Sequence, residues 1–378
     1  MFERNIFTEE QKIFRQNTSK FFNKEILPFH KKWEEKGIVP KELWLKAGAM
    51  GLLCPNVPVK YGGIGGDFRF NVIILEELAK IGATGPGFAV HSDIVAPYII
   101  NYGTDEQKVN YLPKMISGET ISAIAMTEPG TGSDLQNIKT NAIIKDKNII
   151  LNGSKTFITN GQNANLILVV AKTDASKKAK GISIILCEGN RKGFKRGKNL
   201  NKIGLKAQDT SELFFEEVSL PKKNILGNSG QGFQQLMEEL PQERLSIAVT
   251  AIAAAEAAFN WTVEYTKERE AFSKKLIEFQ NTKFVLAKLK AEITVARTFI
   301  DTCVKEHIKN NFTADDGAIA KLWCTELQFK VIDKCLQLHG GYGYMQEYPI
   351  SRAFMDSRVQ RIYGGTSEIM KEIISRNL

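Results

Sequence analysis

The first third of the chain spaces its apolar residues as an amphipathic helix does. They recur at intervals of four and seven positions, for example at Ile13, Phe14, Phe21, Phe22 and Ile26. Proline and glycine interrupt this pattern at Pro28, at Pro40 and over residues 62–66. We therefore expect a helical N-terminal domain over residues 1–118.

From Ile121 to about Val218 the pattern changes to short apolar runs separated by turn residues. The runs fall at residues 121–125, 142–144, 149–151, 166–171, 182–187 and 213–215. Turns are expected at residues 146–148 and at Asn152–Gly153, because Asn-Gly is a strong turn signal. The middle domain, residues 119–226, should consist mainly of strands.

Helical spacing returns after Gly232, and residues 242–316 contain neither glycine nor proline. An apolar stripe at helical spacing runs through Leu245, Val249, Ile252, Ala255, Phe259 and Val263. We interpret this stripe as the core of a bundle rather than as a cofactor site. Residues 227–378 are therefore expected to form a C-terminal helical bundle, so that the fold is α+β and mainly α.

Composition is that of a globular protein without long disordered segments. The chain has 378 residues, of which 43% are hydrophobic and 25% charged. Its five cysteines are widely spaced and form no CxxC pair, which favours a reducing compartment over disulfides or a zinc site. No apolar run approaches the roughly 20 residues of a membrane span, and residues 1–4 lack a signal-peptide pattern. We expect a cytoplasmic bacterial protein.

The formal charge of +9 raises the question of an anionic partner. Part of it is concentrated in one region, at Lys177, Lys178, Lys180, Arg191, Lys192, Lys195, Arg196 and Lys198. Phe194 is the only aromatic residue among them, and no nucleic-acid motif accompanies them. A solvated basic loop is therefore favoured over a nucleic-acid site, and a phosphate-bearing substrate remains compatible.

Several common site motifs are absent from the sequence. The glycines at residues 62–66 and 340–343 do not have GxGxxG spacing, and no P-loop ending occurs. The four histidines form no HExxH pattern, so a metal site is not expected.

Two segments do carry a ligand signal. The apolar run 121–125 leads into Met126–Asp134, a turn rich in hydroxyls and glycines that could present donors to a polar planar ligand. Phe157 and Thr159 would share one face of a strand and offer an aromatic wall beside a hydroxyl. Such a pair suits an isoalloxazine ring, although Phe157 could equally be a core aromatic.

Dispersed motifs make the chain similar, over almost its whole length, to the acyl-CoA dehydrogenase family and most of all to its long-chain members. The matching segments are 127–130, 132–134, 157–160, 242–244, Arg269 with Phe272, 337–343 and 363–368. The resemblance implies an N-terminal helical domain, a middle β-barrel-like domain and a C-terminal four-helix bundle. It also implies FAD as cofactor and a homotetramer.

By the same resemblance, one group of residues would hold the flavin within the chain. Met126, Thr127 and Ser133 would line it, Phe157 would cover one ring face, and Thr159 would hydrogen-bond near N5. Many family members have tryptophan where Phe157 stands.

A second group would reach the FAD of a neighbouring subunit. It comprises Arg269, Phe272, Gln280, Gln337, Leu338, His339, Gly340 and Gly341. Thr366, Ser367 and Glu368 resemble helix N-terminal residues that meet the cofactor. The alternatives are a helix that stops at His339 and a plain N-cap at Thr366.

The resemblance also points to the base. Many family members have a glutamate directly after the position of Tyr363, but this chain has Gly364 there. Long-chain and isovaleryl types take a glutamate from another helix, directly before an arginine, as in Glu243–Arg244. Glu243 is therefore the candidate base.

Two opposite effects on the pKa of Glu243 are expected. Burial beside an acyl chain raises it, whereas a position in the first helical turn after Pro241 lowers it. Desolvation should therefore dominate only in the substrate complex. Without the resemblance, Glu243 is an ordinary acidic residue of a helix start.

The implied substrate site comprises Ser133, Pro241, Arg244, Tyr363, Gly364 and Gly365. The backbone amide of Gly364 would donate to the thioester oxygen, and the missing side chain could admit a longer acyl group.

The implied reaction is FAD-dependent dehydrogenation of a long-chain acyl-CoA to the trans-2-enoyl-CoA, with electrons passed to an electron-transfer flavoprotein. An acyl-CoA oxidase and a catalytically silent protein of the same fold are the alternatives.

Overall fold

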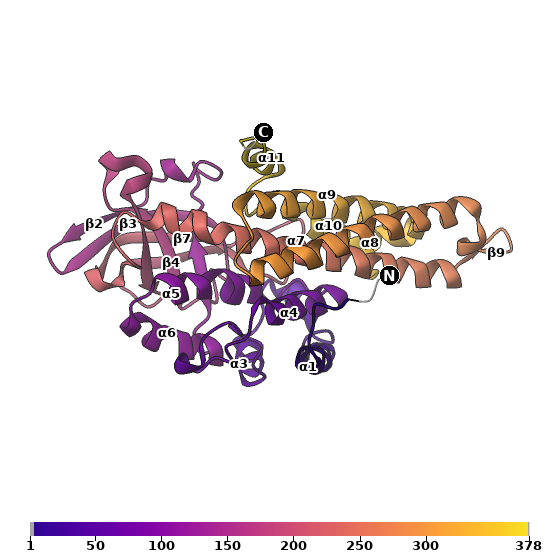
Figure 1. Ribbon diagram of the computed structural model, residues 1–378, viewed down its shortest axis with the longest axis horizontal. Helices are drawn as coiled ribbons and strands as arrows, with labels where there is room; N and C mark the ends of the chain where they lie inside the picture. The colour runs from indigo at the N-terminus through magenta and orange to yellow at the C-terminus, as the bar shows by residue number, and fades with distance from the viewer. Residues whose placement is uncertain (1–3, 377) are drawn as a thin grey trace.

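The computed structural model describes residues 4–376 and 378, and Figure 1 shows a β domain at one end of a long helical bundle. Smaller helices from the first third of the chain lie along the β domain and the near part of the bundle. The predicted order of helical, strand-rich and helical parts is confirmed. The expectation that the chain lacks a signal peptide was based on residues 1–4. Residues 1–3 lie outside the described residues.

The N-terminal part consists of helices separated at the predicted breaks. They are α1 (Glu9–Glu25), α2 (His30–Lys36), α3 (Lys41–Ala49), η1 (Val59–Tyr61), α4 (Phe68–Lys80), η2 (Val90–Val95), α5 (Ala96–Tyr102) and α6 (Asp105–Ser117). Thr8 and Thr104 start α1 and α6 with capping boxes, in which the threonine hydroxyl accepts from the backbone and a glutamine reaches back. The turn η2 is π-helical, a form that often marks functional sites.

The middle part is a curled seven-stranded sheet of order β1-β4-β2-β3-β7-β6, with β5 paired to β4. Its strands are β1 (Ser122–Ala125), β2 (Asn141–Lys145), β3 (Asn148–Thr159), β4 (Leu166–Lys172), β5 (Ile182–Glu188), β6 (Phe194–Asn199) and β7 (Thr210–Pro221). The short helical turns η3 (Leu135–Asn137), η4 (Ala175–Gly181) and η5 (Lys222–Asn224) connect them.

Two local predictions in this part are wrong. The expected turn at Asn152–Gly153 lies inside β3, where a register shift against β7 absorbs the glycine with φ 145°. The other expected turn, at residues 146–148, is confirmed, because the β2–β3 hairpin turns at Asp146, whose φ is 51°. The basic segment is not a loop throughout, because Lys195, Arg196 and Lys198 belong to β6 at the edge of the sheet. Charged residues are common on edge strands, where they discourage pairing with other chains.

The C-terminal part is built on three long helices, α7 (Gly232–Glu268), α8 (Gln280–Ile308) and α9 (Ala314–His339). A small hairpin of β8 (Glu270–Ala271) and β9 (Lys274–Lys275), followed by η6 (Leu276–Glu278), joins α7 to α8 at the end of the bundle farthest from the β domain (Figure 1). The chain ends with η7 (Gly340–Tyr344), α10 (Pro349–Ser357), η8 (Arg358–Arg361) and α11 (Ser367–Ser375).

Helix α7 starts at Gly232, where the sequence indicates that helical spacing returns, and not at Pro241. Pro241 lies inside it, so the expected start at this residue is wrong. Proline removes one backbone donor, but packing of the buried side chains on both sides outweighs this loss. The apolar stripe from Leu245 to Phe259 is buried against α8 and α9, as predicted.

Helix α7 is also the one described helix that is long and apolar enough to cross a membrane. Its most apolar window is 61% buried inside the protein, as expected of a core helix.

A buried charge cluster joins the N-terminal helices to the bundle. Glu76 of α4 accepts hydrogen bonds from Arg4, Arg15 and Arg297 at 2.7–2.9 Å. These arginines hold the pKa of Glu76 at about 2 against the opposing effect of burial. The cluster fixes α4, which forms one wall of the cavity described next.

Candidate active site

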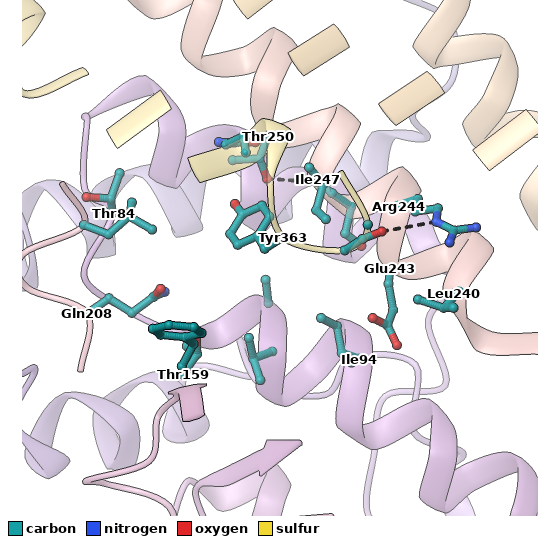
Figure 2. A pocket seen from close by; sticks show the side chains of 18 of the residues that line it. Thr84, Ile94, Thr159, Gln208, Leu240, Glu243, Arg244, Ile247, Thr250 and Tyr363 are labelled. Carbon is teal, nitrogen blue, oxygen red and sulfur yellow. Dashed lines mark hydrogen bonds between the residues drawn. The ribbon is translucent and has the colours of Figure 1, made fainter. Parts of the chain in front are cut away.

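A cavity of about 540 Å³ opens where the three parts of the chain meet. Its walls come from α4, η2, the segment after β1, the end of β3, α7 and the segment from α10 to α11. Figure 2 shows Thr159 and Gln208 on the side of the β domain, and Glu243 and Leu240 of α7 at the other end. Tyr363 lies between them.

The segment after β1 is tied to β3 by a buried ion pair. The ammonium group of Lys155, with no exposed surface, donates to the carbonyl oxygen of Met126 at 2.8 Å and to Glu128 at 2.9 Å. Glu128 also accepts from the backbone N–H groups of Lys139 and Thr140. These bonds fix the turn from which Met126, Thr127 and Ser133 line the cavity.

Phe157 and Thr159 both line the cavity, but not through simple strand alternation. The pairing of β3 with β7 shifts between Lys155 and Ile158, and Phe157 has φ 60°. A bulge of this kind re-aims side chains beside functional sites. The ring of Phe157 is 68% exposed, so it is not a core aromatic.

These residues match the chemistry of a planar polar ligand. Phe157 offers an exposed ring, and three hydroxyls lie along the same wall, at Thr127, Ser133 and Thr159. None of these hydroxyls has a hydrogen-bond partner within residues 4–376 and 378. An apolar plate beside free donors and acceptors is what a flavin ring requires.

Glu243 faces the opposite part of the cavity from the middle of α7. It is only 5% exposed, and the hydroxyl of Tyr98 donates to its Oε1 at 3.0 Å. Burial and, less strongly, the nearby carboxylate of Glu239 raise the pKa of Glu243 to about 7, against the opposing effects of the Tyr98 hydrogen bond and the charge of Arg244.

The expectation for this pKa therefore needs correction. Because α7 starts at Gly232, Glu243 lies beyond the first turn, where the helix dipole has little effect. Desolvation by the protein itself already dominates, and no substrate is required for it.

Arg244 and the C-terminal segment complete this end of the cavity. The guanidinium Nε of Arg244 donates to the carbonyl oxygen of Gly364 at 3.3 Å, as the dashed line in Figure 2 shows. Tyr363, Gly364 and Gly365 line the cavity, and both glycines have positive φ, 64° and 97°.

Pro241, which was expected in the substrate site, does not line the cavity. A Cβ atom on Gly317 would lie 3.1 Å from the Cα of Pro241, so this residue packs against α9.

Gly364 does not simply enlarge the cavity. A Cβ atom at this position would lie 2.6 Å from Cδ1 of Ile247, so the space that a side chain would use is partly filled from α7. The hypothesis that the missing side chain admits longer acyl groups must therefore include Ile247.

The second predicted group lies at the far end of the bundle. Arg269 and residues 337–341 line a separate hollow, together with Tyr265 and Tyr342. Phe272 is 91% exposed in the hairpin, and Gln280 is exposed at the first residue of α8. Within one chain, this group is not brought to the main cavity. The helix stop at His339 is observed, with Gly340 following at φ 57°.

Residues 366–368 also do not line the main cavity. Thr366 is the N-cap of α11 and accepts from the N–H of Ile369, so plain capping accounts for its geometry. Ser367 donates to Glu326 at 2.7 Å, and Glu368 is exposed.

Sequence reasoning missed Tyr98, Lys155 and Lys321 as parts of the site. Tyr98 reaches Glu243 across 145 positions of the chain, and no local pattern signals such a contact. Lys155 is a lysine on a strand, which by composition alone indicates an exposed residue.

Comparison with known proteins agrees with this geometry. Models of three acyl-CoA dehydrogenase domains match in order, the N-terminal domain over residues 8–119, the middle domain over 123–218 and the C-terminal domain over 230–378. The mitochondrial long-chain specific acyl-CoA dehydrogenase of Rattus norvegicus is 52% identical over 377 residues, which cover 99% of this chain and 88% of the relative.

Solved structures agree as well. An acyl-CoA dehydrogenase from Geobacillus kaustophilus superimposes with a TM-score of 0.97 at 48% identity and 99% coverage of both chains. A glutaryl-CoA dehydrogenase from Mycobacterium smegmatis in complex with FADH2 gives 0.92 at 27% identity, covering 98% of this chain and 95% of that one. With an ordered match of all three domains and a relative more than half identical, this chain belongs to the acyl-CoA dehydrogenase family.

Proposed function

We propose that this enzyme dehydrogenates long-chain acyl-CoA to trans-2-enoyl-CoA and passes the electrons to an electron-transfer flavoprotein. One observation carries the proposal. A buried carboxyl group, Glu243, shares a cavity with an exposed aromatic ring and unpaired hydroxyls, and its pKa is about 7. A base that titrates near the working pH is the kind that α-proton removal requires.

FAD is the cofactor of the family, and the β-domain wall of the cavity has the residues to hold it. Phe157 would stack on the ring, while Thr127, Ser133 and Thr159 would hydrogen-bond to its polar edge. FAD, when bound, accepts the hydride that leaves the β-carbon of the substrate.

The residues of this chain perform the proton chemistry. Glu243 removes the α-proton, and the neutral acid that results suits its buried position. The backbone amide of Gly364 donates to the thioester oxygen, where negative charge develops. Arg244 holds the carbonyl group of Gly364 and so fixes the orientation of this turn.

Preference for long acyl chains is supported by the relatives and by the cavity. The lining residues of α7 extend from Phe233 to Trp261, about 42 Å along the helix. On the facing side the wall is apolar, with small or aliphatic side chains at Leu75, Leu78, Ala79, Ala83 and Ala89. Such a wall accommodates methylene groups and offers few partners to polar ones.

A homotetramer is supported by the second group of residues. Arg269 and residues 337–341 line a hollow separate from the main cavity, and Phe272 lies in the β8–β9 hairpin at the end of the bundle farthest from the β domain (Figure 1). This position suits a contribution to the FAD of a neighbouring subunit. Five free and buried cysteines support a reducing compartment, with which the bacterial cytoplasm is compatible.

The test uses the purified enzyme. Its flavin absorbance should bleach anaerobically with saturated acyl-CoAs, faster with long chains than with short ones, and the product should have the mass of the enoyl-CoA. Glu243→Gln should bind acyl-CoA without bleaching. Rapid reoxidation by oxygen would favour an oxidase, and absence of bleaching with every chain length would contradict the proposed reaction.

A further inference from the structure

Two buried cations converge on the glycine turn beside the candidate base. Lys321 of α9 has no exposed surface, and its ammonium group donates to the carbonyl oxygen of Gly365. Arg244 of α7 is 5% exposed and donates to the preceding carbonyl, that of Gly364. The two residues thus hold consecutive peptide groups from two different helices.

Neither cation forms an ion pair with a carboxylate in the described part of the chain. A buried ammonium group whose one observed partner is a carbonyl oxygen is poorly compensated. Burial and the charge of Arg244, opposed by the carboxylates of Glu326 and Glu368, lower the pKa of Lys321 to about 8. An apolar side chain would fill the same space without the cost of burying a charge, so packing alone does not account for a lysine here.

The position of the turn supplies that reason. Gly364 and Gly365 line the cavity, and a Cβ atom on Gly364 would lie 3.9 Å from Cε of Lys321. The lysine therefore lies directly behind the backbone that faces the substrate. Its bond to the carbonyl oxygen of Gly365 and that of Arg244 to the carbonyl oxygen of Gly364 fix the two peptide groups that follow the amide of Gly364.

We propose that Lys321 is a positioning residue for the dehydrogenation. It holds the Gly364–Gly365 turn in the orientation that presents a backbone amide to the thioester oxygen, and its positive charge favours the negative charge that develops on this oxygen. The inference rests on the proposed function, because only proton removal from a thioester creates that charge.

The main test replaces Lys321 with methionine, which keeps the length of the side chain and removes the ammonium group. With long-chain acyl-CoA, kcat of Lys321→Met should fall at least about tenfold while KM stays within about threefold, because the lost interaction is specific to the transition state. Flavin content should be unchanged. The control is Lys330→Met on the same helix, where the lysine is partly exposed and pairs with Glu292. Its kcat should equal that of the unaltered enzyme.

The second measurement is the pH profile of kcat/KM, and its first part uses the unaltered enzyme. The charged groups that face Lys321 are Arg244 from α7, Glu326 from its own helix and Glu368 from α11. The kcat/KM of the unaltered enzyme reports groups of the free enzyme, so it should fall as the pH rises above about 8, when Lys321 loses its charge. Lys321→Met should lack this decline.

The outcomes separate this inference from the proposed function. An unaltered enzyme that oxidises no acyl-CoA would refute the proposed function. An active enzyme whose kcat survives Lys321→Met, or whose KM alone changes, would overturn the role of Lys321. Retention of the alkaline decline in Lys321→Met would also overturn it.

Discussion

Replacing Tyr98 with phenylalanine should raise the pH at which the enzyme becomes active. The hydroxyl of Tyr98 donates to Glu243 at 3.0 Å inside the protein and stabilises the carboxylate form. A hydrogen bond to a charged group contributes about 1.5–3 kcal/mol, and one pKa unit corresponds to about 1.4 kcal/mol. Loss of the bond should therefore raise the pKa of Glu243 by about one to two units.

The sign follows from the role of Glu243 as a base. With a pKa of about 7, the group is about half ionised at pH 7. A pKa one unit higher leaves about a tenth ionised, so kcat/KM at pH 7 should fall about fivefold. Near pH 9 the carboxylate reforms, so kcat/KM of Tyr98→Phe should approach that of the unaltered enzyme measured at the same pH.

The assay is the pH profile of kcat/KM with one long-chain acyl-CoA. Tyr102→Phe is the matched control, because its hydroxyl donates at 2.7 Å to Glu238 on the surface and not to Glu243. The reasoning would be refuted if the pH at which kcat/KM rises is the same in Tyr98→Phe as in the unaltered enzyme. It would also be refuted if Tyr102→Phe shifts this pH by the same amount.

Three further predictions concern stability and cofactor binding. Because the folded state holds the pKa of Glu243 at about 7, above its ordinary value of 4.5, this group favours folding below pH 4.5, and that contribution is lost as the pH rises through 7. Glu243→Gln should therefore stabilise the protein at pH 8 by up to about 3 kcal/mol in urea unfolding, a gain that should vanish at pH 4. Lys155→Met leaves Glu128 buried without its ion-pair partner, which should lower the free energy of unfolding by about 3–5 kcal/mol and weaken FAD binding. Flavin release on dilution measures the binding, and equal retention of flavin would contradict the role of this pair. Glu76, with a pKa of about 2, contributes stability above pH 4.5 that is lost as the pH falls toward 2, so Glu76→Gln should flatten the acid part of the stability curve.

Much of the architecture was predictable because burial imposes a period on the sequence. The stripe from Leu245 to Phe259 and the strand runs at 166–171 and 182–187 are buried on both sides of their elements, and the structure has them where the pattern indicates. The strand β6 was missed because an edge strand needs few apolar residues, and its segment contains three basic residues. The return of helical spacing at Gly232 marked the start of α7 correctly, but Pro241 was wrongly taken as a helix start, because local reasoning treats proline as a boundary whereas tertiary packing keeps the helix intact.

The residues of the candidate site also fall into those that the sequence indicates and those that it does not. Its loop and strand residues lie in two short segments, 126–134 and 157–159, each of which carries a local pattern that indicates a site. The partners that set the chemistry of Glu243 and of the glycine turn are Tyr98 and Lys321, which reach them across 145 and 44 positions. Only the packing of α5, α7, α9 and the C-terminal segment brings them together.

The identity of the base is tested most directly by the rate of flavin reduction in a single anaerobic turnover. Glu239 provides the matched control, because it is a second carboxylate on α7, one turn away and similarly buried at 7% exposure. After mixing with a saturated long-chain acyl-CoA, Glu243→Gln should reduce its flavin at least about a thousandfold more slowly than the unaltered enzyme, while Glu239→Gln keeps most of the rate. Reduction at the unaltered rate in Glu243→Gln would contradict the assignment of the base.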